Sequence, residues 1–148
     1  MGDIEILYIP ILQERPDDTD LFATIEANLA DDRIQDLERA CVLGRRLNSQ
    51  GRTAYGPKNK LMVHIPSGIP IDLFAATEEN WFNYLVCRTG PADSNTRICM
   101  AAQRKGWKWS PYSCGFHALN NGQVAKMGSE EEVFNFVGIP YMTPEARK

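Results

Sequence analysis

An acid inside an apolar run is the feature of this sequence that most constrains the fold. Asp72 stands in Ile71-Asp72-Leu73-Phe74, whose other side chains are typical of a buried strand. An unpaired charge is costly to bury. The fold must therefore give Asp72 a partner or a ligand, or leave it at the edge of a sheet, and this segment alone leaves both interpretations open.

Two further acids open the chain. Asp3 and Glu5 lie two residues apart at the start of a strand predicted over residues 4–10, and alternation places both carboxylates on one side of that strand. If this strand is the neighbour of the one that carries Asp72, three carboxylates converge. Such oxygen ligands suit Mg²⁺ or Mn²⁺, and two ions about 3.5–4 Å apart can clamp the oxygens of a phosphoryl transfer. The alternative is an ordinary frayed terminus beside an edge strand.

The charge balance limits which partners the chain can bind. Its 148 residues include 16 Lys and Arg against 19 Asp and Glu, a net charge of −3. This balance excludes a protein that coats nucleic acid or an anionic membrane through bulk charge. Two acid-free stretches, residues 40–70 and 97–108, hold many of the cations and form either a local phosphate-binding face or ordinary solvated surface.

No stretch approaches the ~20 apolar residues of a membrane span, and no basic-then-apolar leader opens the chain. We therefore expect a soluble, intracellular protein of the cytoplasm or nucleoid, without a membrane partner.

Apolar spacing and turn residues predict an α+β protein in two parts. Strands are expected at residues 4–10, 61–65, 69–74, 107–109, 116–119 and 123–125. Helices are expected at residues 20–30, from about 32 to 47, from 77 to 89, and at 92–105 and 129–138. The pattern changes near Thr77, which gives subdomains of residues 1–77 and 78–148.

Short motifs run through the chain in a fixed order. They are Gly2-Asp3-Ile4-Glu5-Ile6, Lys60-Leu61-Met62-Val63, Ile71-Asp72-Leu73, Arg88-Thr89-Gly90 with Asn95, Lys105-Gly106, Tyr112, and Ser129-Glu130-Glu131-Glu132-Val133-Phe134 followed by Gly138-Ile139-Pro140-Tyr141 and Pro144-Glu145. In order and spacing they resemble the family X DNA polymerases, the polymerase-beta-like nucleotidyltransferases. The stretch from Ser129 to Arg147 is the most specific. The resemblance implies a nucleotidyltransferase-type palm, a small mixed sheet with helices, followed by a thumb-like subdomain with a small antiparallel sheet.

The resemblance also implies roles for residues of this chain. Asp3, Glu5 and Asp72 would be the catalytic acids that bind two Mg²⁺ or Mn²⁺ ions, with Asp72 receiving the proton of a primer 3′-hydroxyl. Glu5 stands where the family more often has Asp. Contacts to the deoxynucleoside triphosphate are expected from Arg88, Thr89, Gly90 and Asn95. Contacts to gapped or primer-template DNA are expected from Lys60, Arg97, Arg104, Lys105, Lys108 and Tyr112.

The sequence departs from the family pattern in three places. Cys87-Arg88 stand where the family has an aromatic pair, and Pro91 stands where it has Ser. The family's Gly-Ser phosphate loop precedes the first metal acid, whereas this sequence begins at Met1. Loss of two triphosphate contacts would weaken nucleotide binding by roughly 3–6 kcal/mol. Four explanations of the missing loop stay open. Arg45, Arg46, Arg52 or Arg88 could replace its contacts with the triphosphate, or a protein partner could supply the loop. The true start codon could lie upstream, or the protein could have lost catalysis and kept DNA binding.

Three functions follow from these observations. The first is metal-dependent nucleotidyl transfer to a DNA 3′ end by a minimal, gap-filling family X-like DNA polymerase. The alternative is a catalytically inactive or partner-dependent DNA-binding or regulatory module derived from such a polymerase. A third is a nucleotidyltransferase that modifies a protein or a small molecule.

Overall fold

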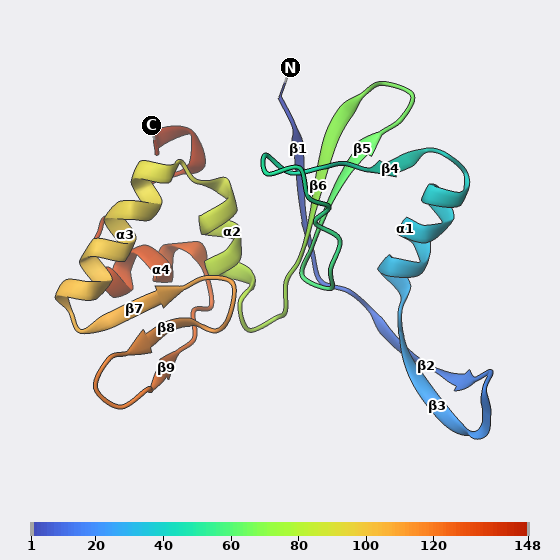
Figure 1. Ribbon diagram of the computed structural model, residues 1–148. Coiled ribbons are helices and arrows are strands. Elements are labelled where there is room, and N and C mark those ends of the chain that lie inside the picture. The colour runs from blue at the N-terminus through green and yellow to red at the C-terminus, as the bar shows by residue number, and fades with distance from the viewer. Residues whose placement is uncertain (1, 148) are drawn as a thin grey trace. The chain divides into compact units, whose positions relative to one another are not determined.

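The computed structural model describes residues 2–147, which form two compact units that divide between Ala75 and Ala76 (Figure 1). The division lies two residues before the boundary expected at 77/78. Both units combine helices with a small sheet, so the α+β class predicted from the sequence is confirmed. Among the described residues, no helix has the length and apolar character needed to cross a membrane.

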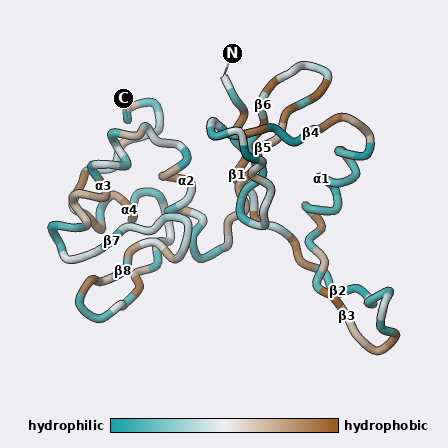
Figure 2. The backbone as a smooth tube through the Cα atoms, viewed as in Figure 1, coloured by the Kyte–Doolittle hydropathy of each residue, from teal (hydrophilic) through white to brown (hydrophobic). Residues whose placement is uncertain are grey.

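The amino-terminal unit is built on a four-stranded mixed sheet in the order β1-β6-β5-β4. Strand β1 (Ile4–Tyr8) runs parallel to β6 (Ile69–Ala75), and antiparallel pairings then join β6 to β5 (Asn59–His64) and β5 to β4 (Leu43–Arg45). Helix α1 (Leu29–Arg39) packs on this sheet through a core formed by Ile34, Leu43, Met62 and Leu73. Apolar residues follow the strands of the sheet (Figure 2).

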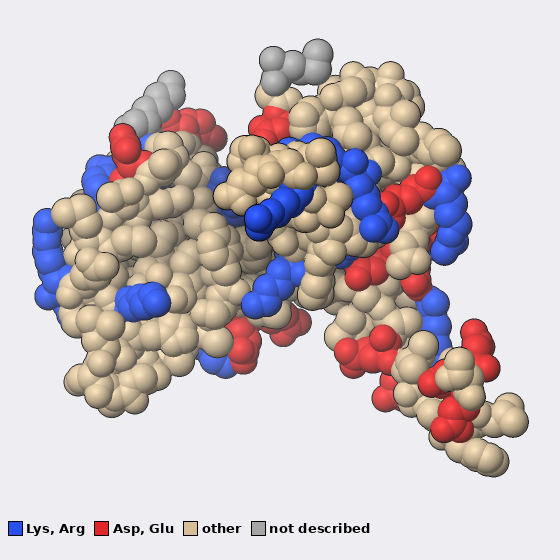
Figure 3. All heavy atoms as spheres, in the orientation of Figure 1, with Lys and Arg blue, Asp and Glu red and all other residues tan. Residues whose placement is uncertain are grey.

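A hairpin replaces the helix predicted at residues 20–30. Strands β2 (Leu12–Asp17) and β3 (Asp20–Asn28) form a separate two-stranded antiparallel ribbon that extends from the unit (Figure 1). Two acids close the turn of this hairpin. The Asp17 carboxylate accepts bonds from the Thr19 N–H at 2.8 Å and the Thr19 hydroxyl at 2.6 Å, and Asp20 accepts one from the Phe22 N–H. Acidic residues gather on this ribbon (Figure 3).

The helix predicted from about 32 to 47 is shorter and begins earlier. Asn28 caps α1, because its side chain accepts bonds from the Ala30 and Asp31 N–H groups. The helix ends at Arg39, and Cys41 adopts a φ of 55°, in the left-handed region that terminates helices. The following apolar residues, which seemed to continue the helix, lead into β4.

A small polar cluster ties α1 to the sheet. Glu38 accepts a bond from Arg45 Nε at 2.7 Å and one from the Tyr55 hydroxyl at 2.9 Å, while the Arg45 guanidinium lies 3.7 Å from the centre of the Tyr55 ring. The hydrogen bond from Arg45 holds the pKa of Glu38 below its ordinary value of 4.5.

This cluster predicts an acid-side loss of stability. A carboxylate with a lowered folded pKa stabilises the protein at pH values above its unfolded pKa, and that contribution disappears as the pH falls through the folded pKa. Glu38→Gln should therefore reduce the fall in melting temperature between pH 7 and pH values below 4.5. Thermal unfolding followed by circular dichroism measures this, with the exposed Glu78→Gln as the matched control. Equal pH dependence in wild type and Glu38→Gln would contradict it.

The carboxy-terminal unit contains three helices, α2 (Trp81–Thr89), α3 (Ala92–Arg104) and α4 (Glu130–Val137). It also contains an antiparallel sheet of β7 (Trp107–Ser110), β8 (Gly115–Ala118) and β9 (Val124–Ala125), and the short 3₁₀ helix η1 (Pro144–Ala146). Phe116 lies at the centre of its core, fully buried and with its ring centroid 4.5 Å from that of Phe136. Trp109 is also buried and donates its indole N–H to Asn83 at 2.9 Å, so it belongs to the core.

Local signals account for the ends of α4. The Ser129 hydroxyl accepts a bond from the Glu132 N–H at 3.1 Å, and Gly138 adopts the left-handed conformation at the other end.

The segment after α4 is held in place by Arg147, which is 1% exposed. Its guanidinium bonds to the Met142 carbonyl at 2.9 Å and to Glu130 at 3.1 Å, and lies over the Phe134 ring. The stretch from Ser129 to Arg147, on which the sequence resemblance mainly rests, is therefore folded and packed along its length.

Candidate metal centre and nucleic-acid contacts

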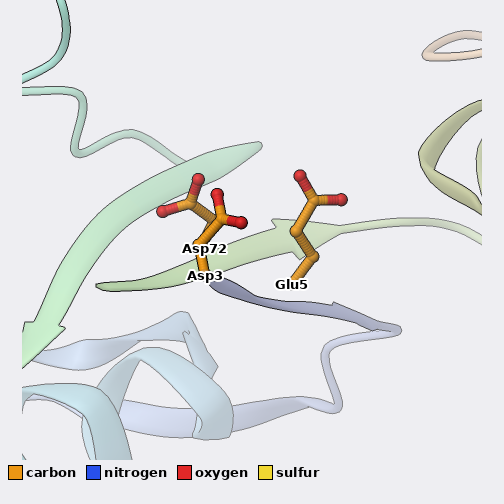
Figure 4. Close-up of side chains that lie close together, drawn as sticks. All are labelled: Asp3, Glu5 and Asp72. Carbon is orange, nitrogen blue, oxygen red and sulfur yellow. The ribbon is translucent and has the colours of Figure 1, made fainter. Parts of the chain in front are cut away.

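Three carboxylates meet at the β1–β6 edge of the amino-terminal sheet. Glu5 lies opposite Asp72 in the parallel register of the two strands, and Asp3 lies two residues before Glu5. One oxygen from each of the three carboxylates lies within 4.8 Å of the other two. Figure 4 shows the three side chains standing on the same side of the strands. The structure therefore brings together the three acids that the strand alternation and pairing predicted.

The three acids differ in their surroundings. Asp3 and Glu5 are exposed, whereas Asp72 is only 6% exposed. Hard divalent cations such as Mg²⁺ take carboxylate oxygens that are partly open to water, because they keep part of their hydration shell. A set of one buried and two exposed carboxylates fits that requirement, and Asp3, Glu5 and Asp72 would hold the ion.

Arg46 is the partner that Asp72 requires. Its Nη2 and Nε donate to the same Asp72 oxygen, Oδ1, at 2.5 and 3.2 Å. This pairing orients the carboxylate and balances its charge, and it leaves Oδ2 for another ligand. Sequence patterns do not predict this pair, because the two residues are 26 positions apart. Arg46 was expected only as one possible substitute for the missing triphosphate contacts.

Lys60 lies inside the amino-terminal unit. Its side chain is 3% exposed, forms a 2.8 Å ion pair with Asp31 and donates to the Gly56 carbonyl at 3.0 Å. A buried ammonium needs such partners to offset the cost of removing it from water. Lys60 thus joins β5 to α1, and its contact with DNA stays a prediction.

The expected nucleotide contacts lie where α2 ends. Arg88 and Thr89 form its last turn, and Gly90 follows with φ 62° and a cis peptide bond to Pro91. The Asn95 side-chain amide donates to the Cys87 carbonyl at 2.8 Å and so satisfies an end carbonyl of α2, while its Oδ1 is buried without a hydrogen-bond partner. Asn95 thus has a structural role, and the contacts of these residues with a nucleotide stay predictions.

Tyr112 joins the same region to the loop after β7. Its hydroxyl accepts a bond from the Cys87 thiol at 3.2 Å, and its ring packs edge-on against Tyr84 at 4.9 Å. Partial burial, and then the bond with Cys87, raise the pKa of Tyr112 above its usual value. Tyr112 remains 49% exposed, so it is open to an external contact.

The remaining predicted DNA contacts are exposed cations of the carboxy-terminal unit. Arg97 and Arg104 lie on α3, Lys105 is the residue after it, and Lys108 is on β7. Lys105 also donates to the Phe136 carbonyl at 3.2 Å. Their exposure is compatible with phosphate contacts, which remain predictions.

Comparison with known proteins gives a family match for the carboxy-terminal unit and a structural match for most of the chain. Residues 84–148 match the family model of the DNA polymerase beta thumb. A crystal structure of Leishmania infantum polymerase beta in a ternary P/T complex has a similar fold, with a TM-score of 0.64 and 18% sequence identity. The alignment covers 81% of this chain and 53% of that chain, so the chain spans about half the length of this solved relative. No curated protein matches the chain.

These findings agree with the resemblance drawn from the motifs. The thumb match contains the stretch from Ser129 to Arg147, and the structural likeness extends beyond the thumb into the amino-terminal unit, since it covers four fifths of the chain. Residues 84–148 thus match the thumb of DNA polymerase beta, and the chain is polymerase-beta-like in fold.

Proposed function

We propose that this protein transfers a nucleotidyl group to the 3′ end of DNA in short gaps, as a minimal family X-type DNA polymerase. The observation that supports this proposal most is the convergence of Asp3, Glu5 and Asp72 within 4.8 Å, in a chain that also carries a polymerase beta thumb. Neither feature alone would point to this reaction. Acid clusters occur without metal ions, and a thumb without acids has no chemistry to perform.

The three acids would act through their charge and position. When bound, two Mg²⁺ or Mn²⁺ ions supply the charge stabilisation of phosphoryl transfer and increase the acidity of the attacking hydroxyl. Asp3 and Glu5 would provide exposed oxygens at the start of β1, and Asp72 would provide a carboxylate oxygen from the neighbouring strand β6. Asp72 would accept the proton of the primer 3′-hydroxyl, while Arg46 holds its other oxygen in place.

Partners of this reaction are part of the proposal. The solved relative is in a ternary P/T complex, which supports primer-template DNA as the macromolecular substrate. The exposed cations Arg97, Arg104 and Lys108 would contact its phosphates, and the region around Arg88 and Gly90 would contact the deoxynucleoside triphosphate. A protein partner could complete the triphosphate site. We place the reaction in the cytoplasm or the nucleoid.

Incorporation of one labelled nucleotide into a one-nucleotide gapped duplex tests the proposal. We expect a product with Mg²⁺ or Mn²⁺ and none with a chelator. Calorimetric titration with Mn²⁺ is a second readout that needs no turnover: wild type should bind the ion and Asp3→Asn should bind it more weakly. Asp18→Asn, an exposed acid of the hairpin, is the matched control. Metal binding without incorporation would reject the polymerase activity and retain the metal site.

A second candidate function is a DNA-binding or regulatory module without catalysis. The ion pair of Arg46 with Asp72 favours it, because this pair neutralises the buried acid without any metal ion. This candidate predicts that DNA binding weakens with salt and in Arg104→Ala and Lys105→Ala, while gapped DNA gains no nucleotide under any metal condition. Affinity that does not change with salt would contradict it.

A further inference from the structure

The tip of the β2–β3 hairpin exposes two large apolar side chains. Leu21 is 97% exposed and Phe22 is 98% exposed, directly after the turn that Asp17 and Asp20 close. Surface apolar residues are common, but two adjacent and fully solvated ones at the end of a ribbon form an anchor of the kind found at protein interfaces. The proposed nucleotidyl transfer assigns no role to this ribbon.

The hairpin is also strongly acidic. Residues 12–28 contain five acids, Glu14, Asp17, Asp18, Asp20 and Glu26, and one base, Arg15, which already pairs with Asp32 at 2.6 Å. Glu14 and Glu26 lie directly opposite each other in the register of β2 and β3. Like charges at this position destabilise a hairpin, and a cation from outside would relieve the repulsion. The acids therefore disfavour a nucleic acid as the ligand of the hairpin and favour a basic protein surface.

A surface of the required kind exists on the same chain. The basic loop, residues 46–58, contains no acid, and it exposes Arg52 and Lys58 together with Leu47, which is 58% exposed. Within the described residues, neither Arg52 nor Lys58 forms an ion pair, in contrast to Arg45 and Arg46. The hairpin extends away from the sheet that carries this loop (Figure 1), and the acidic ribbon is plainly visible in Figure 3.

We propose that the β2–β3 hairpin is an arm that binds a second copy of this chain, with Leu21 and Phe22 placed against Leu47 and the acids of the arm against Arg52 and Lys58. Two arms pairing with each other would bring like charges together, so the arm of one copy binds the loop of the other. Reciprocal exchange satisfies both arms and both loops and closes a two-fold dimer.

Sedimentation velocity of the whole chain across a concentration series at low salt tests the proposal. Wild type should sediment with twice the mass of the chain, and association should weaken as salt is added. Leu21→Ser and Phe22→Ser should each weaken association, with the aromatic substitution costing about a hundredfold. Leu119→Ser is the matched control, since Leu119 is 63% exposed but lies in the carboxy-terminal unit after β8.

Charge reversal identifies the contact itself. Glu14→Lys with Asp18→Lys on the arm, and Arg52→Glu with Lys58→Glu on the loop, should each give a monomer, and mixing the two proteins should restore a dimer. None of these residues belongs to the acid cluster, and circular dichroism confirms that each variant is folded. A wild type that stays monomeric at all concentrations would overturn the proposal. So would an equal effect of Leu119→Ser, or a mixture that stays monomeric while only the loop variant loses affinity for DNA.

Discussion

Asp72→Asn is expected to lower the rate of nucleotide incorporation by about 10²–10⁴-fold, the usual effect of removing a positioned proton acceptor. Asparagine keeps the size of the side chain but removes the charge that a divalent cation and a hydroxyl proton both require. The measurement is single-turnover extension on a gapped duplex at saturating nucleotide, so that weak nucleotide binding does not mask the chemical step. This prediction depends on the proposed function, and an unchanged rate would contradict it.

The Arg46 pair makes the control for this experiment necessary. Asp72→Asn leaves Arg46, whose side chain is only 27% exposed, without its carboxylate partner. A charged group that has lost its partner in a partly buried position destabilises the fold. The double variant Asp72→Asn with Arg46→Gln removes both charges and should regain thermal stability without regaining activity. Asp3→Asn also separates the effect on activity from the effect on stability. Because Asp3 is exposed, removing its charge should lower activity and leave thermal stability almost unchanged.

Phe116→Ala is expected to lower the free energy of unfolding of the carboxy-terminal unit by about 3–5 kcal/mol. Phe116 is fully buried, and its ring lies against Phe136 at 4.5 Å and stacks on Trp109 at 6.2 Å, so alanine leaves a cavity among aromatic rings. This is a large share of the about 5–15 kcal/mol that stabilises a typical domain.

Urea denaturation followed by tryptophan fluorescence measures this change. All three tryptophans, Trp81, Trp107 and Trp109, lie in the carboxy-terminal unit, so the signal reports that unit alone. The midpoint should fall while the slope stays constant. The control Leu119→Ala, at an exposed position, should change the free energy by no more than about 0.5 kcal/mol. A midpoint for Phe116→Ala equal to that of the control would show that the core does not depend on this ring.

The acid cluster could be predicted because it depends on few assumptions. Alternation along one strand fixes the relation between Asp3 and Glu5, and a single strand pairing adds Asp72. The capping residues of α4 are equally local, since Ser129 and Gly138 mark its ends by their own chemistry. Where a residue and its nearest neighbours determine the structure, the sequence was sufficient.

Sequence patterns were insufficient where a short apolar run is ambiguous, and where residues far apart in the chain meet. Leu21, Phe22 and Ile25 have helical spacing, but a short apolar pattern does not distinguish a helix from a strand, and the Asp17–Thr19 turn favours the hairpin. The burial of Lys60 could not be predicted from the sequence, because nothing near it in the chain identifies Asp31 as its partner. The same limit applies to Arg46, whose partner is known only once β4 and β6 belong to one sheet.

The order of strands in the amino-terminal sheet has a consequence for how the acid cluster forms during folding. Strands β4, β5 and β6 pair with strands next to them in the chain, whereas the pairing of β1 with β6 closes a loop that spans almost the whole unit. Long loops cost more entropy and close later, and an edge strand such as β1 separates more easily than an internal one. Asp3 and Glu5 arrive and leave with that strand. The acid cluster is thus the last part of the sheet to be assembled and the first to be lost when the unit begins to open.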